Sequence, residues 1–139
     1  MRPGFVNLFR GIIAAMQKRI LMIDDDDLIQ AVAELVLGSV PGWTLQGALT
    51  GEEGLRLATS SPPDLILLDW VLPGMEGPAV LERLAENPAT QAVPVIMLTA
   101  MARDEAERAA SQLGAIGILT KPFEPDTLAE RISSLMGWA

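Results

Sequence analysis

Several residue types are missing from this chain, and each absence excludes a class of chemistry. The 139 residues include no cysteine, which excludes disulfides and thiolate metal sites. They also include no histidine, which excludes a Ser-His-Asp triad and the usual zinc sites. No stretch approaches the roughly 20 apolar residues of a membrane span. The length suits one compact domain, and a hydrophobic content of 50% allows a sizeable core.

Positive charge is scarce outside the N-terminal segment. The first 19 residues contain no acid and four basic residues, which are Arg2, Arg10, Lys18 and Arg19. The formal net charge is −8, so the remaining 120 residues, with 6 basic and 18 acidic side chains, carry −12. A domain this acidic is repelled by nucleic acid and by anionic lipid. We therefore expect a cytoplasmic protein that binds other proteins rather than nucleic acid or membrane.

Short apolar runs alternate with segments of helical periodicity after residue 18. The apolar runs predict five strands, at residues 19–23, 44–48, 64–68, 94–98 and 116–120. The segments between and after them predict five helices, at residues 27–37, 52–59, 78–85, 102–113 and 127–136. Asp26 or Asp27 can cap the first of these helices. The alternation predicts an α/β fold with an open, doubly wound parallel sheet covered on both faces.

Residues 1–17 form an N-terminal extension to the predicted domain at residues 18–139. The apolar residues of the extension fall on one face of a helix and are Phe5, Leu8, Phe9, Ile12, Ile13 and Met16. Arg10 interrupts the apolar stretch and no small-residue cleavage site is evident, which argues against a secretory signal. Two interpretations stay open: a native helix whose apolar face binds something, or upstream sequence with Met16 as the natural start.

Five polar residues lie where predicted strands end: Asp24, Asp25, Asp69, Thr99 and Lys121. The carboxyl ends of parallel strands share one edge of a sheet, and ligand sites form there. We therefore expect three carboxylates, a hydroxyl and an ammonium in one cleft. Such a group suits a divalent metal, because Mg²⁺ prefers oxygen ligands, and it suits a phosphoryl group. Without metal, the crowding should raise the pKa of at least one carboxylate.

Each of these residues also has an ordinary explanation. Asp24 and Asp25 can end a strand and cap a helix, since aspartate is a favoured cap. Thr99 taken singly would be a strand-end hydroxyl, and Lys121 a solvated lysine. Four consecutive aspartates at residues 24–27 exceed what one cap needs, however. The five residues taken together therefore favour the functional interpretation.

Five motifs in a fixed order carry a resemblance to a known family. They are Lys-Arg-Ile-Leu-Met-Ile-Asp-Asp-Asp at 18–26, Pro-Asp-Leu-Ile-Leu-Leu-Asp at 63–69, Leu-Pro-Gly-Met-Glu-Gly at 72–77, Pro-Val-Ile-Met-Leu-Thr-Ala at 94–100, and Gly-Ala through Lys-Pro-Phe at 114–123. Over residues 18–136 the chain resembles the receiver domain of two-component response regulators, of the single-domain, chemotaxis-regulator type. The resemblance implies a flavodoxin-like sheet with strand order 2-1-3-4-5.

The resemblance also implies a metal site. Asp69 would be the carboxylate that accepts a phosphoryl group. Asp25 and Asp69 would bind Mg²⁺ together with the main-chain carbonyl of Val71, and Mn²⁺ could substitute. Asp24 would hold a metal-bound water.

The remaining implied roles concern the phosphoryl oxygens and the response to phosphorylation. Thr99 would hydrogen-bond a phosphoryl oxygen and Lys121 would pair with the group, with the Lys121–Pro122 peptide bond cis. Receivers usually carry Tyr or Phe three residues before the lysine, and its ring changes rotamer as the threonine moves. This chain has Ile118 there, so we expect weak or rewired coupling to the surface.

The implied function is that of a stand-alone receiver. It would take a phosphoryl group from a sensor histidine kinase or a histidine phosphotransfer protein, and would catalyse only its own phosphorylation and dephosphorylation. It would then change its affinity for an unknown downstream protein, and a phosphorylation-linked homodimer is compatible with this scheme.

Two alternatives stay open. A haloacid-dehalogenase-like phosphatase would use the Asp-x-Asp pattern at residues 24–26, with Thr99 and Lys121 as its later motifs. That alternative leaves Asp69 without a role, and the sequence lacks a later acidic pair and a cap region. The other alternative is a degenerate receiver that binds partners without phosphorylation, against which the complete acidic set argues.

Overall fold

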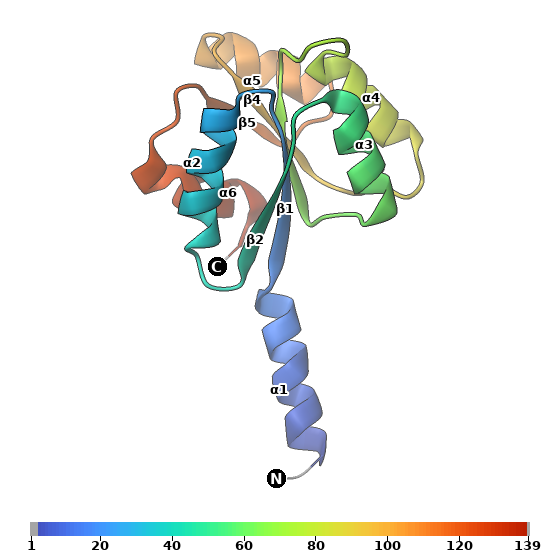
Figure 1. Cartoon of the computed structure of the whole chain (residues 1–139), viewed down its shortest axis with the longest axis vertical. Helices are drawn as coiled ribbons and strands as arrows, with labels where there is room; N and C mark the ends of the chain where they lie inside the picture. The colour runs from blue at the N-terminus through green and yellow to red at the C-terminus, as the bar shows by residue number, and fades with distance from the viewer. Residues whose placement is uncertain (1–2, 139) are drawn as a thin grey trace.

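A computed structural model describes residues 3–138, which include a five-stranded parallel sheet with helices on both faces (Figure 1). The strands are β1 (Lys18–Ile23), β2 (Trp43–Ala48), β3 (Leu65–Asp69), β4 (Val95–Thr99) and β5 (Gly117–Thr120). They are hydrogen-bonded in the order β2-β1-β3-β4-β5, and all four pairings are parallel. The predicted fold class and strand order are confirmed.

Helices precede, connect and follow the strands. They are α1 (Pro3–Met16), α2 (Asp27–Gly38), α3 (Gly51–Ser60), α4 (Gly77–Glu86), α5 (Arg103–Gln112) and α6 (Pro125–Met136). Each boundary of the five strands and of α2 to α6 lies within two residues of its predicted position. Within the described residues, no helix has both the length and the apolar content needed to cross a membrane.

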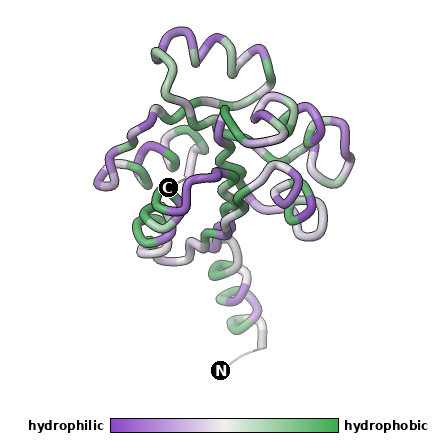
Figure 2. The backbone as a smooth tube through the Cα atoms, turned by 45° about the horizontal axis from the view of Figure 1, so that its top comes forward, coloured by the Kyte–Doolittle hydropathy of each residue, from purple (hydrophilic) through white to green (hydrophobic). Residues whose placement is uncertain are grey.

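The sheet separates two hydrophobic layers. Side chains alternate along a strand, so Leu21 and Ile23 of β1 face α3, α4 and α5, whereas Ile20 and Met22 face α2 and α6. β3 and β4 are buried along their whole length, which explains why their sequences are continuous apolar runs. In Figure 2 a cluster of hydrophobic residues runs along the central strands.

The start of α2 frees two aspartates for the site. Asp26 is the N-cap residue, because its Oδ1 accepts hydrogen bonds from the backbone N–H groups of Leu28 (2.9 Å) and Ile29 (3.1 Å). Of the two predicted caps, the structure therefore selects Asp26 over Asp27. One carboxylate satisfies this helix end, and Asp24 and Asp25 are not needed for capping.

The N-terminal extension is helical. Figure 1 shows α1 running away from the domain, roughly in line with β1. Met16, the last residue of α1, is separated from β1 by one residue. The segment thus has the helical conformation that its periodicity indicates, and its apolar face lies outside the core of the domain; that it is a native part of the protein stays a prediction.

Candidate functional site

The sheet brings the predicted polar residues to one edge. Asp24 directly follows β1, Asp69 ends β3, Thr99 ends β4 and Lys121 directly follows β5. Neighbouring strands end within one residue of each other in register. Residues separated by almost a hundred positions therefore meet at the carboxyl edge, as predicted for a parallel sheet.

Lys121 joins two strand ends by ion pairs. Its Nζ lies 2.6 Å from Oδ2 of Asp24 and 3.1 Å from Oδ2 of Asp69. The Asp24 side chain is fully buried, and that of Lys121 is 17% exposed. One ammonium therefore compensates two carboxylates in a poorly solvated place, which leaves the site with a net negative charge.

The unequal charges shift the pKa values of both partners. Burial raises the pKa of Asp69, and the charge of Asp24 raises it further, while Lys121 opposes the shift only in part. Burial lowers the pKa of Lys121, but the nearby carboxylates of Asp24 and Asp69 outweigh it and raise that pKa above its usual value. The lysine therefore keeps its charge at neutral pH, and the predicted rise in a carboxylate pKa is found at Asp69.

The acidic cluster has the composition of a site for a hard cation. Carboxylate oxygens of Asp24, Asp25 and Asp69 all lie within 4.8 Å of one another. Oδ2 of Asp24 is buried and, although paired with Lys121, lacks a hydrogen bond of acceptable geometry. Asp25 is exposed at the mouth of the site. A cluster of three carboxylates, one of them open to solvent, fits Mg²⁺, which binds through few carboxylates and keeps several waters.

Val71 lies two residues beyond Asp69 in the loop after β3. Its backbone N–H donates a long hydrogen bond of 3.4 Å to Oδ1 of Asp69. This contact turns one Asp69 oxygen toward the loop and the other toward Lys121. The role of the Val71 carbonyl as a metal ligand stays a prediction.

Thr99 is held by its neighbours in the loop after β4. Its buried Oγ1 accepts a hydrogen bond of 3.0 Å from the Met101 N–H, and its carbonyl accepts one of 2.7 Å from the Lys121 N–H. The hydroxyl hydrogen is left for another acceptor. The Lys121–Pro122 bond is cis, as expected.

Sequence reasoning missed Gln30, which fixes the backbone under the site. Its Nε2 lies within hydrogen-bond distance of the carbonyls of Met22 (2.9 Å), Asp24 (3.2 Å) and Ala48 (3.0 Å). These contacts join the ends of β1 and β2 beside the acidic pair. A sequence signal existed, because Gln30 lies three and seven positions before Ala33 and Leu37, the buried residues of α2.

Gly77 allows the loop after β3 to close over Asp69. A Cβ atom at this position would lie 2.4 Å from the Asp69 carbonyl oxygen. The Gly77 N–H also donates a 2.9 Å hydrogen bond to the Trp70 carbonyl. The second glycine of the Leu-Pro-Gly-Met-Glu-Gly motif is therefore required by a close backbone approach.

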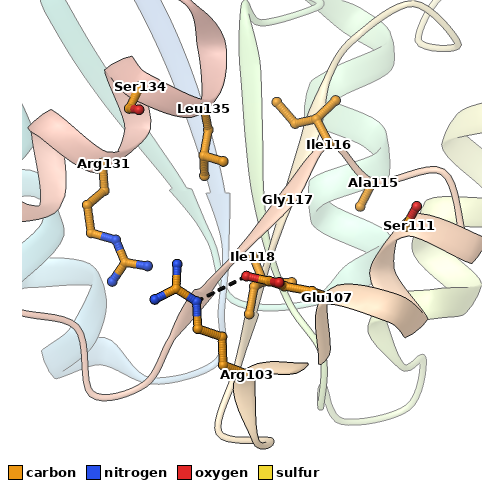
Figure 3. A pocket seen from close by; sticks show the side chains of 10 residues that line it. All are labelled: Arg103, Glu107, Ser111, Ala115, Ile116, Gly117, Ile118, Arg131, Ser134 and Leu135. Atoms are coloured by element: carbon orange, nitrogen blue, oxygen red, sulfur yellow. Dashed lines mark hydrogen bonds and ion pairs between the residues drawn. The ribbon is translucent and has the colours of Figure 1, made fainter. Parts of the chain in front are cut away.

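Ile118 lies away from the edge and is buried beneath the surface formed by α5, β5 and α6. It is 4% exposed and lines a pocket of about 390 Å³ between the two helices. Figure 3 shows the guanidinium groups of Arg103 and Arg131 approaching each other there, with Arg103 Nε paired to Glu107 Oε1 at 3.0 Å. Ile118 therefore lines the floor of a pocket with a polar rim.

A doubly wound sheet with a lysine between two aspartates at its carboxyl edge defines a flavodoxin-like protein with an acidic edge site. The family of the response regulator receiver domain matches residues 20–133. This chain belongs to that family. The predicted resemblance is confirmed, and the membership favours a receiver over the phosphatase alternative, in which Asp69 had no role.

Known relatives support the same assignment. The chain is 37% identical over 118 residues to the DNA-binding dual master transcriptional regulator RpaA of Synechocystis, covering 85% of this chain and 48% of that protein. It is 35% identical over 121 residues to the phosphate regulon transcriptional regulatory protein PhoB of Escherichia coli, covering 87% and 52%. The chain thus spans about half the length of the curated relatives it matches.

Solved structures agree with the fold. The chemotaxis response regulator CheY4 of Vibrio cholerae superposes with a TM-score of 0.79 at 27% identity, covering 86% of this chain and 98% of that one. The receiver domain of the Francisella response regulator 1452 superposes with a TM-score of 0.77 at 29% identity, covering 87% and 98%. Both neighbours match the receiver part of the chain almost end to end.

Proposed function

We propose that this protein is a stand-alone, cytoplasmic receiver that is phosphorylated on Asp69. The donor is a phosphohistidine of a sensor histidine kinase or a histidine phosphotransfer protein. The observation that carries the proposal is the position of Asp69, a buried carboxylate at a strand end with Lys121 on one oxygen and the acidic pair of β1 beside it.

The reaction moves one phosphoryl group from a histidine nitrogen of the donor to a carboxylate oxygen of Asp69. An oxygen of the Asp69 carboxylate bonds to phosphorus as the phosphorus–nitrogen bond of the donor breaks. The electron pair of that bond returns to the imidazole, which takes up a proton, and Asp69 becomes an acyl phosphate. Attack of water on phosphorus later releases phosphate and restores the carboxylate. The domain thus catalyses its own phosphorylation and dephosphorylation and acts on no other substrate.

Each residue of the site has a separate role in the transfer. Lys121 supplies a fixed positive charge where phosphoryl oxygens gather negative charge, and its raised pKa keeps it charged. Thr99 can donate its free hydroxyl hydrogen to a phosphoryl oxygen. Asp24, Asp25 and Asp69 would hold Mg²⁺ or Mn²⁺ with the Val71 carbonyl, and the ion would neutralise charge on the transferring group.

The output of the domain is a changed affinity for another protein. Phosphorylation adds charge and acceptor oxygens at the edge of the sheet, and the loop after Thr99 leads directly into α5. The partners are the phosphoryl donor and a downstream protein, and the acidic surface disfavours nucleic acid and membrane. A phosphorylation-linked homodimer is one form that this output can take.

Labelling with a small phosphoryl donor tests the proposal. Incubation with acetyl phosphate and Mg²⁺ should add one phosphoryl group, measured by intact-protein mass spectrometry. Asp69→Asn should abolish the addition, whereas Asp104→Asn, an exposed change on α5, should leave it intact. Labelling that persists in Asp69→Asn and disappears in Asp24→Asn would favour the phosphatase. Absence of labelling in the wild-type protein would favour the degenerate receiver.

A further inference from the structure

α1 presents a wide apolar face outside the domain. Its large exposed apolar side chains are 42–62% exposed and belong to Phe5, Leu8, Phe9, Ile12, Ile13 and Met16. At 3.6 residues per turn they share one arc of about 140°, with Asn7 and Arg10 on the other side of the helix. The rings of Phe5 and Phe9 already stack, with centroids 6.5 Å apart. A contiguous apolar patch of this kind marks a contact surface.

The apolar positions of α1 read the same from either end. If a second α1 lies antiparallel to the first, each apolar residue lies at the same height as another whose number brings the sum to 21. Phe5 then meets Met16 and Phe9 meets Ile12 in the middle of the face, whereas Leu8 and Ile13 line its two edges. An interface about a two-fold axis requires this self-complementarity, because each copy contributes the same patch. Arg10 lies on the opposite side of the helix and would stay in water.

The domain end of α1 opens on a pocket that suits the far end of a second α1. This pocket of about 480 Å³ lies at the amino ends of the strands and is lined in part by Met16, Val40, Pro41, Trp43, Glu130 and Trp138. Trp43 and Trp138 meet edge to face there, with centroids 5.3 Å apart. In the antiparallel arrangement, the partner's Phe5 lies opposite Met16 and therefore at the mouth of the pocket.

We propose that two copies of this chain associate through α1, antiparallel about a two-fold axis, with the tip of each helix in the pocket at the base of the other. The six half-exposed side chains offer roughly 100 Å² each, or about 600 Å² per copy. Contact with the pocket brings the buried area toward the ~800 Å² per partner of a standard interface. This association joins the ends of the sheets remote from Asp69 and needs no phosphorylation.

A lipid surface is the rival occupant of the apolar face. The first 19 residues are basic, but residues 20–139 carry a balance of −12 and are repelled by anionic headgroups. Binding to a lipid surface requires neither a self-complementary spacing of apolar residues nor an aromatic pocket at the base of the helix. A second copy explains the spacing and the pocket together.

Sedimentation velocity of the full chain tests the association with two neighbouring substitutions of equal charge. The wild-type protein should be a dimer at micromolar concentration. Leu8→Glu places a carboxylate in the apolar face and should raise the dissociation constant at least tenfold. Asn7→Glu adds the same charge on the other side of α1 and should leave the dimer intact. Circular dichroism checks that both variants keep the fold.

Mixed disulfides test the antiparallel geometry, since the chain has no cysteine of its own. An oxidised mixture of Phe5→Cys and Met16→Cys proteins should yield the heterodisulfide, whereas Phe5→Cys by itself should cross-link far less, because the two copies of position 5 lie at opposite ends of the helix pair. A monomeric wild-type protein, equal effects of the two glutamates, or preferred Phe5→Cys homodimers would each overturn the proposal. So would a monomer that floats with phosphatidylcholine–phosphatidylglycerol vesicles and loses this binding in Leu8→Glu.

Discussion

At the carboxyl ends of the strands, one lysine stands between two buried aspartates; at the amino ends, two tryptophans meet edge to face. Both groups are built on the same five strands, yet their contacts have opposite consequences for stability. The raised pKa of Asp69 means that its charged form is less favourable in the folded protein than in water. The aromatic pair removes apolar surface from water with no such cost.

The comparison shows how a receiver separates chemistry from stability along one sheet. Charge that is costly in the folded protein is held at one edge, where a bound cation can relieve it. Apolar contacts at the other edge and in the two layers hold the strands in register. Substitutions at the carboxyl ends of the strands should therefore change the labelling of Asp69. Substitutions at the amino ends should change the free energy of unfolding but not the labelling.

The largest effect is expected from Gly77→Ala. The new Cβ would lie 2.4 Å from the Asp69 carbonyl oxygen, a backbone atom that cannot move aside without shifting the acceptor. We expect a loss of about 3 kcal/mol in the free energy of unfolding, measured by urea denaturation, together with slower labelling by acetyl phosphate.

Gly38→Ala is the matched control, because no atom lies within 4 Å of a Cβ at Gly38. This residue ends α2, so alanine should be neutral or stabilise by up to about 1 kcal/mol. Equal stabilities of the two variants would show that the close approach at Gly77 is not required.

Lys121→Met should come next in size. The change leaves the carboxylates of Asp24 and Asp69 facing each other without their cation. We expect a loss of about 2 kcal/mol without metal, below the 3–5 kcal/mol of a fully buried pair because the lysine is partly exposed. Mg²⁺ should then raise the melting temperature more than it does in the wild-type protein, as differential scanning fluorimetry would measure.

Lys18→Met removes a cation from the other end of the sheet, where the ammonium lies 5.1 Å from the centre of the Trp138 ring. Its cost should be about 0.5–1 kcal/mol, with no change in the response to Mg²⁺. If Lys18→Met altered that response as strongly as Lys121→Met, the two ends would not be independent.

Trp138→Ala should separate stability from labelling. The substitution removes the edge-to-face contact with Trp43 and the ring under Lys18, both on a partly exposed surface. We expect a loss of about 1–2 kcal/mol in the free energy of unfolding. Labelling of Asp69 at a temperature where the variant is folded should keep the wild-type rate. A slower rate there would mean that the amino end of the sheet influences the site.

The difference between the two ends also explains what could be predicted from the sequence. Asp24, Asp69, Thr99 and Lys121 each end a strand, and the geometry of parallel sheets sends strand ends to one edge whatever the loops do. No comparable rule joins Trp43 to Trp138. Their contact depends on where α6 ends relative to β2, which the local sequence does not specify.

Within α2, periodicity identified the helix but did not predict which residues are buried. Leu28 and Leu35 are apolar residues at helical spacing within the predicted helix at 27–37, yet they are 73% and 77% exposed, while Ala33 and Leu37 are buried. Hydrophobicity favours the two leucines over Ala33, so the small residue on the inner face gave little signal. Gln30 was missed because the buried face of α2 gives a weak hydrophobic signal. A polar residue next to such a face cannot be distinguished from one on the solvent-exposed side of the helix.

Compared with the wild-type protein, Asp69→Asn should be more stable in the absence of metal at neutral pH but not at low pH. The folded-state pKa of Asp69 lies above its usual value of 3.8, so the folded protein binds the proton more tightly than the unfolded chain. Stability is therefore lost as pH rises through the interval between the two pKa values, and it stays lost at neutral pH. Asparagine removes this loss, so melting with EDTA at pH 7 should rise by a few degrees. Below pH 3.8 the gain should vanish, and a gain that persists there would have another cause.

The smallest effect is expected at Ile118. When phosphoryl oxygens attract Thr99, its movement should open space behind it. Ile118 is stiff at χ1 and has no polar end group, so it should respond little to that movement. Its side chain is already 4% exposed and packed in the layer with α5. Any signal must then pass through the backbone after Thr99 into α5, where we expect a coupling of about 1–3 kcal/mol or less.

Ile118→Tyr tests this account, because the pocket between α5 and α6 can receive a ring (Figure 3). Labelling of Asp69 should not change, since position 118 lies outside the acidic cluster. Amide shifts of α5 and β5 on adding acetyl phosphate, measured by two-dimensional NMR, should be small in the wild-type protein and larger in Ile118→Tyr. The ring has two places to occupy, beside Thr99 or in the pocket, whereas the isoleucine has one. Large shifts in the wild-type protein that disappear in Ile118→Tyr would instead identify Ile118 as a working switch residue.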